Sequence, residues 1–160
     1  MKQKLKFASS FLVAGLFLFM AYGSGGSASA EKVDIKSEQD CKSYVLGKWK
    51  DNKTYSGMVV YYRLEITNSQ IKCWKKADAT MAGAGSDEWS DTPNEVVNYN
   101  IGTLQTDSKG NKFRLLGKIE YGDVFISSGQ KDDMGSLTVG NTEFDYNSDY
   151  LYPTKGWELK

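Results

Sequence analysis

The alternating stretch Met58–Thr67 constrains the fold of this chain more than any other feature. Every second residue of the stretch, starting at Met58, is apolar, and we call these residues one parity of the strand. The residues between them, the other parity, become polar toward the end of the stretch. The apolar parity holds Met58, Val60, Tyr62, Leu64 and Ile66. Because a β-strand points successive side chains to opposite faces, the stretch predicts a strand with one face toward a core and the other toward water.

Further apolar runs separated by turn residues follow the same period, and helical periodicity is nearly absent after Leu46. Besides 58–67, strands are predicted at 48–51, 71–76, 95–106, 112–121, 124–128, 136–139 and 156–159. On the 112–121 strand the predicted apolar face holds Phe113, Leu115, Ile119 and Tyr121. About seven or eight strands joined by short turns indicate a mainly β fold, a single antiparallel up-and-down barrel.

A short N-terminal helix is expected before the strands, from Glu38 to Leu46. Ser37 suits the N-cap, because its hydroxyl can accept a bond from the first turn of the helix. Apolar residues recur at i, i+3 and i+4, which predicts one buried face. These residues are Cys41, Tyr44 and Val45.

The first 30 residues have the order of a secretory signal peptide. Three lysines precede an apolar run from Phe11 to Tyr22, and small residues end at Ala30. A membrane anchor is the alternative, but the run is about a dozen residues and a spanning helix needs roughly 20. We expect cleavage near Ala30, leaving one domain of residues 31–160, secreted or periplasmic, with no membrane anchor.

The two cysteines, Cys41 and Cys73, suggest a disulfide in an exported protein. Such a bond would close a loop of 32 residues and contribute about 3–4 kcal/mol in the chain-entropy account. A reactive thiol pair is the alternative, and the chain has no C-x-x-C spacing to support it.

Charge and histidine content exclude several functions. Residues 31–160 hold 17 basic and 20 acidic side chains, which argues against nucleic acid and anionic membranes as partners. The chain has no histidine, so serine–histidine and cysteine–histidine catalysis and histidine zinc sites are excluded. We predict no catalytic residue, no metal site and no cofactor, and an enzyme without histidine remains the third alternative.

The acidic side chains do not form a recognisable site. Asp87, Glu88, Asp91, Asp132, Asp133 and Asp149 are candidate calcium ligands. They lack the spacing of a calcium loop, so solvated charge is the favoured interpretation. Glu65 and Glu120 are available for two-carboxylate hydrolysis, but the strand pattern places both on solvent-facing positions.

Residues 77–94 have no periodicity, and a loop of this length is typically functional or disordered. One interpretation is a solvated excursion, and the other is a lid or recognition loop anchored by Trp89. Aromatic residues on inward parities are candidates for a ligand pocket, with core filling as the alternative for each. The candidate ligand-binding residues are Tyr62, Trp89, Tyr99 and Tyr121.

Gly47-Lys48-Trp49 resembles the G-x-W motif that opens the barrel of lipocalins, and Ser148-Asp149-Tyr150 is similar to their T-D-Y motif. The family's late arginine has no counterpart, since the arginines are Arg63 and Arg114. The resemblance concerns the layout of residues 47–160, and it implies a lipocalin-like β-barrel with a ligand cavity.

These observations predict a secreted protein that binds a small apolar or amphipathic ligand. The alternative is a protein-binding inhibitor of a protease or lysozyme that acts through the 77–94 loop. A ligand binder would have a hollow interior under Trp89. An inhibitor would have a filled interior and an exposed Trp89.

Overall fold

The computed structural model describes residues 32–55, 57–78, 89–129, 132–142 and 150–157. The predicted signal peptide, residues 79–88 of the predicted 77–94 loop, and Ser148 and Asp149 lie outside the described residues. Within the described part of the chain, no helix combines the length and the apolar character that crossing a membrane requires.

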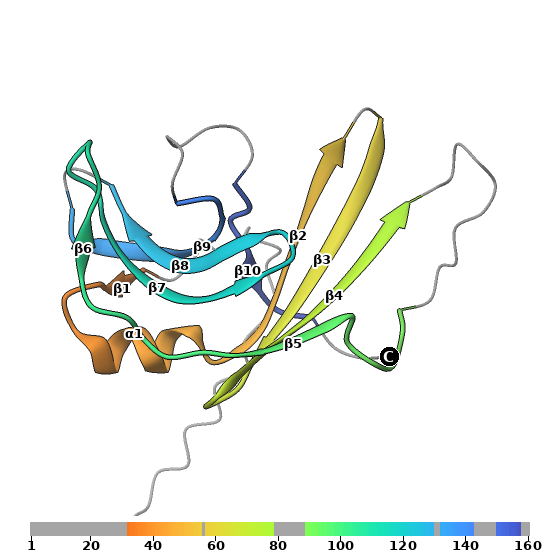
Figure 1. Ribbon diagram of the computed structural model, residues 1–160, viewed down its shortest axis with the longest axis horizontal. Helices are drawn as coiled ribbons and strands as arrows, with labels where there is room; N and C mark the ends of the chain where they lie inside the picture. Colours follow the sequence, from red (N-terminus) through yellow and green to blue (C-terminus); the bar gives the residue numbers. More distant parts are fainter. Residues whose placement is uncertain (1–31, 56, 79–88, 130–131, 143–149, 158–160) are drawn as a thin grey trace, which may run out of the picture.

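The described strands form two antiparallel sheets, each of five strands, accompanied by one helix (Figure 1). Sheet A has the order β1-β9-β8-β7-β6, and sheet B has the order β10-β2-β3-β4-β5. The elements are β1 (Val33–Asp34), α1 (Glu38–Val45), β2 (Gly47–Tyr55), β3 (Met58–Ile66), β4 (Gln70–Asp78), β5 (Glu95–Asn98), β6 (Gln105–Thr106), β7 (Lys112–Ile119), β8 (Gly122–Ser128), β9 (Met134–Gly140) and β10 (Thr154–Lys155). The prediction of a mainly β, antiparallel fold with a short N-terminal helix is confirmed.

The single closed barrel is not confirmed, because the described strands divide between the two sheets. The predicted strand 95–106 changes partner along its length. β5 pairs with β4, and then the amides of Asn100 and Gly102 donate to the carbonyl oxygens of Leu116 and Leu115 of β7, at 3.3 and 2.7 Å. The bend at this change of partner separates β5 from β6 and ends sheet B.

A second segment passes between the other edges of the two sheets. Leu151 and Val139 of β9 exchange two backbone hydrogen bonds, and β10 then pairs with β2. Pro153 lies between these contacts, and a proline has no N–H to donate to a ladder. The ladder is therefore interrupted where the chain leaves sheet A for sheet B.

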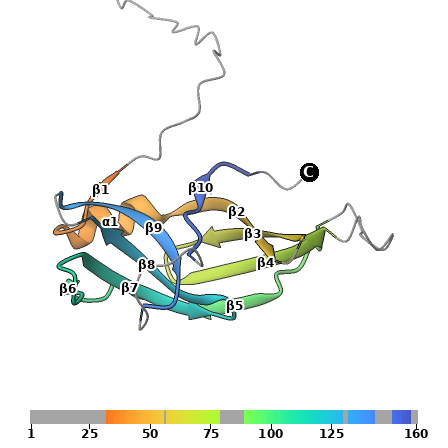
Figure 2. The ribbon, with the colours of Figure 1, turned by 90° about the horizontal axis from the view of Figure 1, so that it is seen from above.

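The helix lies beside β1 at one end of the sheets (Figure 2). Ser37 Oγ accepts from the Asp40 amide at 3.1 Å, and the predicted apolar face of α1 is buried. Trp49 Nε1 donates to the Val45 carbonyl at 2.7 Å, which joins the end of the helix to β2. The predicted helix is confirmed, and it ends at Val45 with Leu46 as C-cap.

The predicted alternation of 58–67 is confirmed in β3 from Tyr61 to Ile66, whereas Met58, predicted on the apolar face, is 43% exposed. Leu64 and Ile66 are buried on the inner face of sheet B, and Arg63 lies on the opposite, outer face. The parity of β7 differs from its prediction: Arg114 and Leu116 are buried, whereas Phe113 and Leu115 are half-buried. The pairing of β7 with β8 shifts between Leu115 and Gly117, and this irregularity changes which parity faces the core.

The predicted disulfide is wrong, because both cysteines are buried free thiols. Cys41 Sγ lies 3.7 Å from the carbonyl oxygens of Asp34 and Ile35, beside β1. Cys73 lies on β4, and its Sγ is 3.9 Å from the Trp74 carbonyl oxygen. Each sulfur is thus directed to carbonyl groups of its own neighbourhood. Burial raises the pKa of the Cys41 thiol and raises that of Cys73 to about 12.

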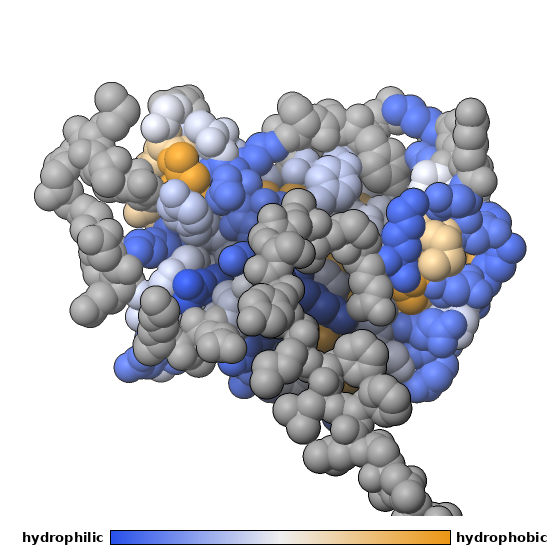
Figure 3. Space-filling model, turned by 180° about the vertical axis from the view of Figure 1, so that it is seen from behind, coloured by the Kyte–Doolittle hydropathy of each residue, from blue (hydrophilic) through white to orange (hydrophobic). Residues whose placement is uncertain are grey.

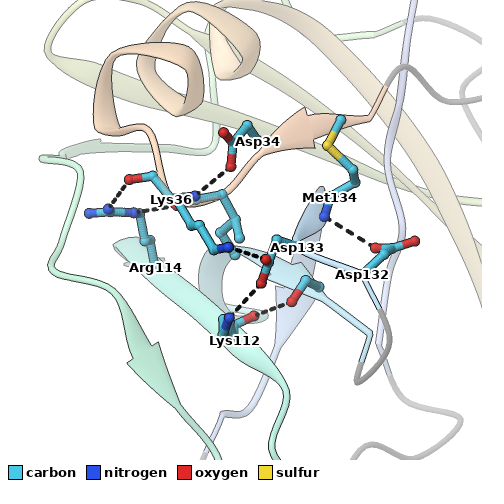
Figure 4. A network of polar contacts seen from close by, with 9 residues as sticks. Asp34, Lys36, Lys112, Arg114, Asp132, Asp133 and Met134 are labelled. Atoms are coloured by element: carbon cyan, nitrogen blue, oxygen red, sulfur yellow. Dashed lines mark hydrogen bonds and ion pairs between the residues drawn. The ribbon is translucent and has the colours of Figure 1, made fainter.

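A polar network fixes β1 and the start of α1 to sheet A (Figure 4). Arg114 of β7 donates from Nε to the Ile35 carbonyl at 2.8 Å and from Nη2 to the Lys36 carbonyl at 2.9 Å. Asp133 forms ion pairs with both Lys36 and Lys112. These contacts bind the segment before the helix to β7 and to Asp133, the residue that precedes β9.

Candidate functional site

Two of the predicted ligand-binding tyrosines lie together at the end of the molecule opposite α1. Tyr62 comes from the inner face of β3, and Tyr121 comes from the turn between β7 and β8. Their ring centroids are 5.0 Å apart, and the rings are tilted by 57°. The pair brings one aromatic residue from each sheet into contact.

A cleft of about 310 Å³ opens beside this aromatic pair. The ends of β2, β3 and β4 extend past the β7–β8 turn (Figure 1), and the cleft lies between these strands and the turn. Its lining consists of Tyr55, Tyr62, Cys73, Lys75, Asn94, Glu95, Glu120 and Tyr121. The described end of the predicted 77–94 loop, Asn94, is therefore part of its wall.

The rim of the cleft is charged and hydrogen-bonded. Lys75 Nζ lies 2.7 Å from Glu120 Oε2, so an ion pair connects β4 to the β7–β8 turn. Glu95 Oε2 accepts from the Glu120 amide at 2.8 Å, and Asn94 Oδ1 accepts from the Lys75 amide at 2.8 Å. These bonds hold the two sides of the cleft in register.

The floor of the cleft is neutral. Burial raises the pKa of the Cys73 thiol to about 12. Burial, followed by the neighbouring Tyr55, raises the pKa of the Tyr62 hydroxyl well above its ordinary value. Both groups therefore keep their protons at neutral pH, and the cleft has a neutral floor beneath a charged rim.

The other two predicted binding residues lie elsewhere. Tyr99 is buried, and its hydroxyl donates to the Thr67 carbonyl at 2.7 Å, near the β3–β4 turn. Trp89 lies over the outer face of sheet B, with its ring centroid 4.0 Å from Arg63 Cζ. The structure thus brings Tyr62 and Tyr121 together and separates them from Tyr99 and Trp89.

Sequence reasoning missed the charged residues of the cleft. Lys75 shares the inward parity of β4 with Ile71 and Cys73, which are both buried. A lysine at the next inward-facing position after a row of apolar residues is a signal of a polar cavity at the end of the strand. Glu95 and Glu120 carry no comparable signal, because each begins or follows a strand.

The interior near the helix is filled. The space between Trp49, Leu64, Ile119 and Leu151 leaves no room for a water molecule.

The carboxylates considered for hydrolysis are on different faces. Glu65 Oε2 pairs with Lys72 Nζ at 3.1 Å on the outer face of sheet B, whereas Glu120 lines the cleft. Asp132 and Asp133 pair with lysines. Asp91 is exposed, and Asp87, Glu88 and Asp149 lie outside the described residues. Within the described ranges, no three potential metal ligands lie together.

A wider hollow of about 530 Å³ lies at another edge of sheet A. Glycines and serines of β8 and β9 contribute much of its wall, with Met134 and Tyr152 at its margin. The pair Lys32–Asp132 beside it spans 3.1 Å between exposed side chains. Exposed pairs of this kind stabilise little, and the hollow has no aromatic pair comparable to that of the cleft.

The described surface seen from behind is mostly hydrophilic, with small hydrophobic areas (Figure 3). No family model matches this chain, and comparisons with curated proteins and with solved structures find no significant match. The functional argument therefore depends on the geometry of the chain itself.

Proposed function

We propose that this protein is an exported binding protein that holds a small amphipathic ligand in the cleft between sheet B and the β7–β8 turn. The observation that carries the proposal is the Tyr62–Tyr121 pair, 5.0 Å apart, beneath the ion pair of Lys75 and Glu120. Aromatic walls supply apolar contact, and the charged rim supplies groups that orient a polar end. The chemistry of the cleft thus matches a guest with one apolar part and one polar part.

The size of the cleft supports a compact guest. Its volume of about 310 Å³ lies at the lower end of the roughly 300–1,000 Å³ typical of small-molecule pockets. The filled interior near Trp49 excludes a long guest that would reach the helix.

The export and barrel predictions belong to the same proposal. The charged, apolar and small-residue order of residues 1–30 supports secretion or export to the periplasm. The bonds from residues 100 and 102 to β7, and from Leu151 to Val139 of β9, lie where the chain passes between the two sheets on either side. They support a lipocalin-like barrel arrangement in which these two segments complete the wall.

The test is a titration of the purified protein with 1-anilinonaphthalene-8-sulfonate, an amphipathic fluorescent probe. We expect saturable binding, and the Tyr121→Ala variant should weaken it about tenfold, because a buried aromatic contact is typically worth more than 1 kcal/mol. Tyr152→Ala is the matched control, since Tyr152 is 53% exposed and lies outside the cleft. Equal affinities of wild type and Tyr121→Ala would contradict the proposal.

A second function is favoured by the position of Trp89. Trp89 lies over the outer face and does not line the cleft, which supports this alternative, whereas its half-buried state against Arg63 differs from the exposed tryptophan expected of an inhibitor. We propose inhibition of a protease or lysozyme as the alternative function. Assays of purified trypsin and lysozyme with wild type and Trp89→Ala test it, and this function requires inhibition that the substitution removes.

A further inference from the structure

The outer face of sheet B gathers cationic side chains from neighbouring strands. In the pairing of the strands, Arg63 of β3 lies opposite Lys50 of β2, and Tyr61 lies opposite Lys76 of β4. Since paired residues of an antiparallel ladder point to the same side, these residues share one face. That face is the reverse of the one that forms the cleft.

Arg63 is held between two indole rings. Its Cζ lies 4.0 Å from the ring centroid of Trp89 and 5.0 Å from that of Trp157. Trp157 is itself fixed, because its Nε1 donates to the Leu64 carbonyl at 3.1 Å. Trp74 packs against it, with the ring centroids 5.4 Å apart. The guanidinium is therefore positioned by rings before any ligand arrives.

No described carboxylate neutralises this arginine. Neither Arg63 nor Lys50 nor Lys76 forms an ion pair with a residue that the structure describes. Asp51 borders the same hollow, but its two oxygens accept the amides of Asn52 and Tyr152, each at 2.7 Å. Among the described residues that line the hollow, three cationic side chains thus face one carboxylate, and that carboxylate forms no ion pair with any of them.

The hydrogen-bond donors of Arg63 meet no acceptor among the residues that the structure describes. Its guanidinium makes no hydrogen bond with a described residue, whereas Arg114 donates to three carbonyl oxygens, those of Ile35, Lys36 and Gly102. Burial lowers the pKa of the Arg63 guanidinium. On the same face, Trp74 Nε1 is buried and has no hydrogen-bond partner within the described part of the chain. The donors of Arg114 are engaged by the backbone and stabilise the fold, whereas those of Arg63 are available to a ligand.

A hollow of about 430 Å³ lies beside Arg63. Its lining includes Lys50, Asn52, Tyr61, Arg63, Lys76 and Trp89. A guanidinium binds carboxylate or phosphate through two parallel N–H bonds, and neighbouring lysines add charge. Asn52 and Tyr61 supply neutral groups that suit the hydroxyls of an organic body.

We propose that this hollow is a second binding site, for a small organic oxyanion such as a sugar carboxylate or sugar phosphate, with Arg63 binding the oxyanion group. The hollow shares Tyr62 with the cleft, but its charged residues are different ones: Lys50, Asp51, Arg63 and Lys76 here, and Lys75, Glu95 and Glu120 in the cleft. A guest of this chemistry needs both an anionic group for Arg63 and a polar body for the neutral side chains.

The experiment is isothermal titration calorimetry of the purified protein at low salt with four probes: glucuronate, glucose 1-phosphate, glucose and inorganic phosphate. We expect saturable binding of glucuronate or glucose 1-phosphate, and the stronger of the two identifies the anionic group. Added salt should weaken the binding, because exposed charges are screened. Binding of glucose as tight as that of its anionic counterparts, binding of inorganic phosphate alone, or no binding at all would overturn the proposal.

The variants assign the binding to Arg63. Arg63→Gln should lower the affinity for the oxyanion about tenfold or more. Arg63→Lys should recover only part of this affinity, because lysine keeps the charge but lacks the two parallel N–H donors of a guanidinium. Lys118→Gln is the charge-matched control, since Lys118 is exposed on β7 of sheet A. Each variant is also unfolded with urea, and a midpoint and near-ultraviolet circular dichroism spectrum equal to those of wild type show that Arg63→Gln is folded. Each variant is titrated with the amphipathic probe as well, which compares its affinity in the cleft with that of wild type. An Arg63→Gln variant that keeps both probe and oxyanion affinity would refute the assignment.

Discussion

Arg114 Nε donates to the carbonyl oxygen of Ile35 over 2.8 Å, which ties the middle of β7 to the turn that precedes the helix. The same guanidinium satisfies the carbonyls of Lys36 and Gly102, and the arginine is 8% exposed. We expect Arg114→Met to lower the free energy of unfolding by about 1–3 kcal/mol, since it leaves the buried carbonyl of Ile35 unpaired, whereas water can reach the part-buried carbonyls of Lys36 and Gly102. Urea unfolding measures the loss. Lys118→Gln should stay within about 0.5 kcal/mol of wild type, and equal losses in both variants would contradict the structural role of Arg114.

Gly102 is required by the close approach of its backbone to β7. A Cβ at this position would lie 2.8 Å from the carbonyl oxygen of Leu115. Gly102→Ala should therefore destabilise the protein by about 1–3 kcal/mol, through movement of the segment that connects the two sheets. Gly129→Ala is the control, because a Cβ there meets nothing within 4 Å. A neutral Gly102→Ala in chemical denaturation would show that this contact is not tight.

Trp49 joins the helix to β2 through its Nε1 bond to Val45 and through burial, with 2% of its surface exposed. Trp49→Phe removes the donor and part of the ring, leaving a buried carbonyl unpaired and a small cavity. We expect a loss of about 2–4 kcal/mol of unfolding free energy. Thermal unfolding followed by circular dichroism measures it. An unchanged transition would mean that the helix is not held by this residue.

Asp133 predicts a pH dependence of stability. Its hydrogen bond with Lys112, followed by that with Lys36, lowers the pKa of its carboxyl in the folded state. The unfolded chain therefore takes up the proton more readily, and stability is lost as the pH falls from about 4, the unfolded value, through the lower folded pKa. The urea midpoint of Asp133→Asn should decline less steeply than that of wild type in this range. Parallel pH profiles would exclude a contribution from Asp133.

The thiols predict a chemical behaviour opposite to that of a disulfide. In the native protein both should react slowly with a thiol reagent, because burial protects them and raises their pKa values, that of Cys73 to about 12. In concentrated urea both should react, and the intact mass should show no loss of two hydrogens. A chain without reactive thiol in urea, and lighter by two hydrogens, would show that Cys41 and Cys73 are bonded.

Local patterns in the sequence predict the elements of this fold well. The alternation of 58–67 and the capped face of α1 depend on residues close together in the chain, and both are confirmed, the alternation from Tyr61 to Ile66. Partner changes between strands are not local. The division of 95–106 into β5 and β6 depends on the carbonyls of Leu115 and Leu116, which belong to a later strand. The irregularity of β7 does have a local signal, Gly117 inside the strand, but that signal does not tell which face turns toward the core.

The candidate site shows the same limit. Tyr62 was identifiable from the parity of its own strand, but its contact with Tyr121 depends on how the two sheets meet. The two cysteines look alike in sequence, and only their separate neighbourhoods in the fold, beside β1 and on β4, overturn the expected bond. Arg63 and Arg114 are likewise the same residue type in the sequence. They differ in the fold, because the donors of Arg114 form hydrogen bonds with backbone carbonyl groups and those of Arg63 form none with described residues.

The alternation of β3 has a consequence for how this protein can change over time. Tyr62 faces the cleft, and its neighbour Arg63 faces the opposite hollow. Inserting or deleting one codon in this strand would exchange the two, carrying a charge into the neutral floor and a phenol to the outer face. Insertions or deletions inside this strand are therefore tolerable only in pairs of residues. We expect the turns at its ends to change in length more readily during evolution than its interior.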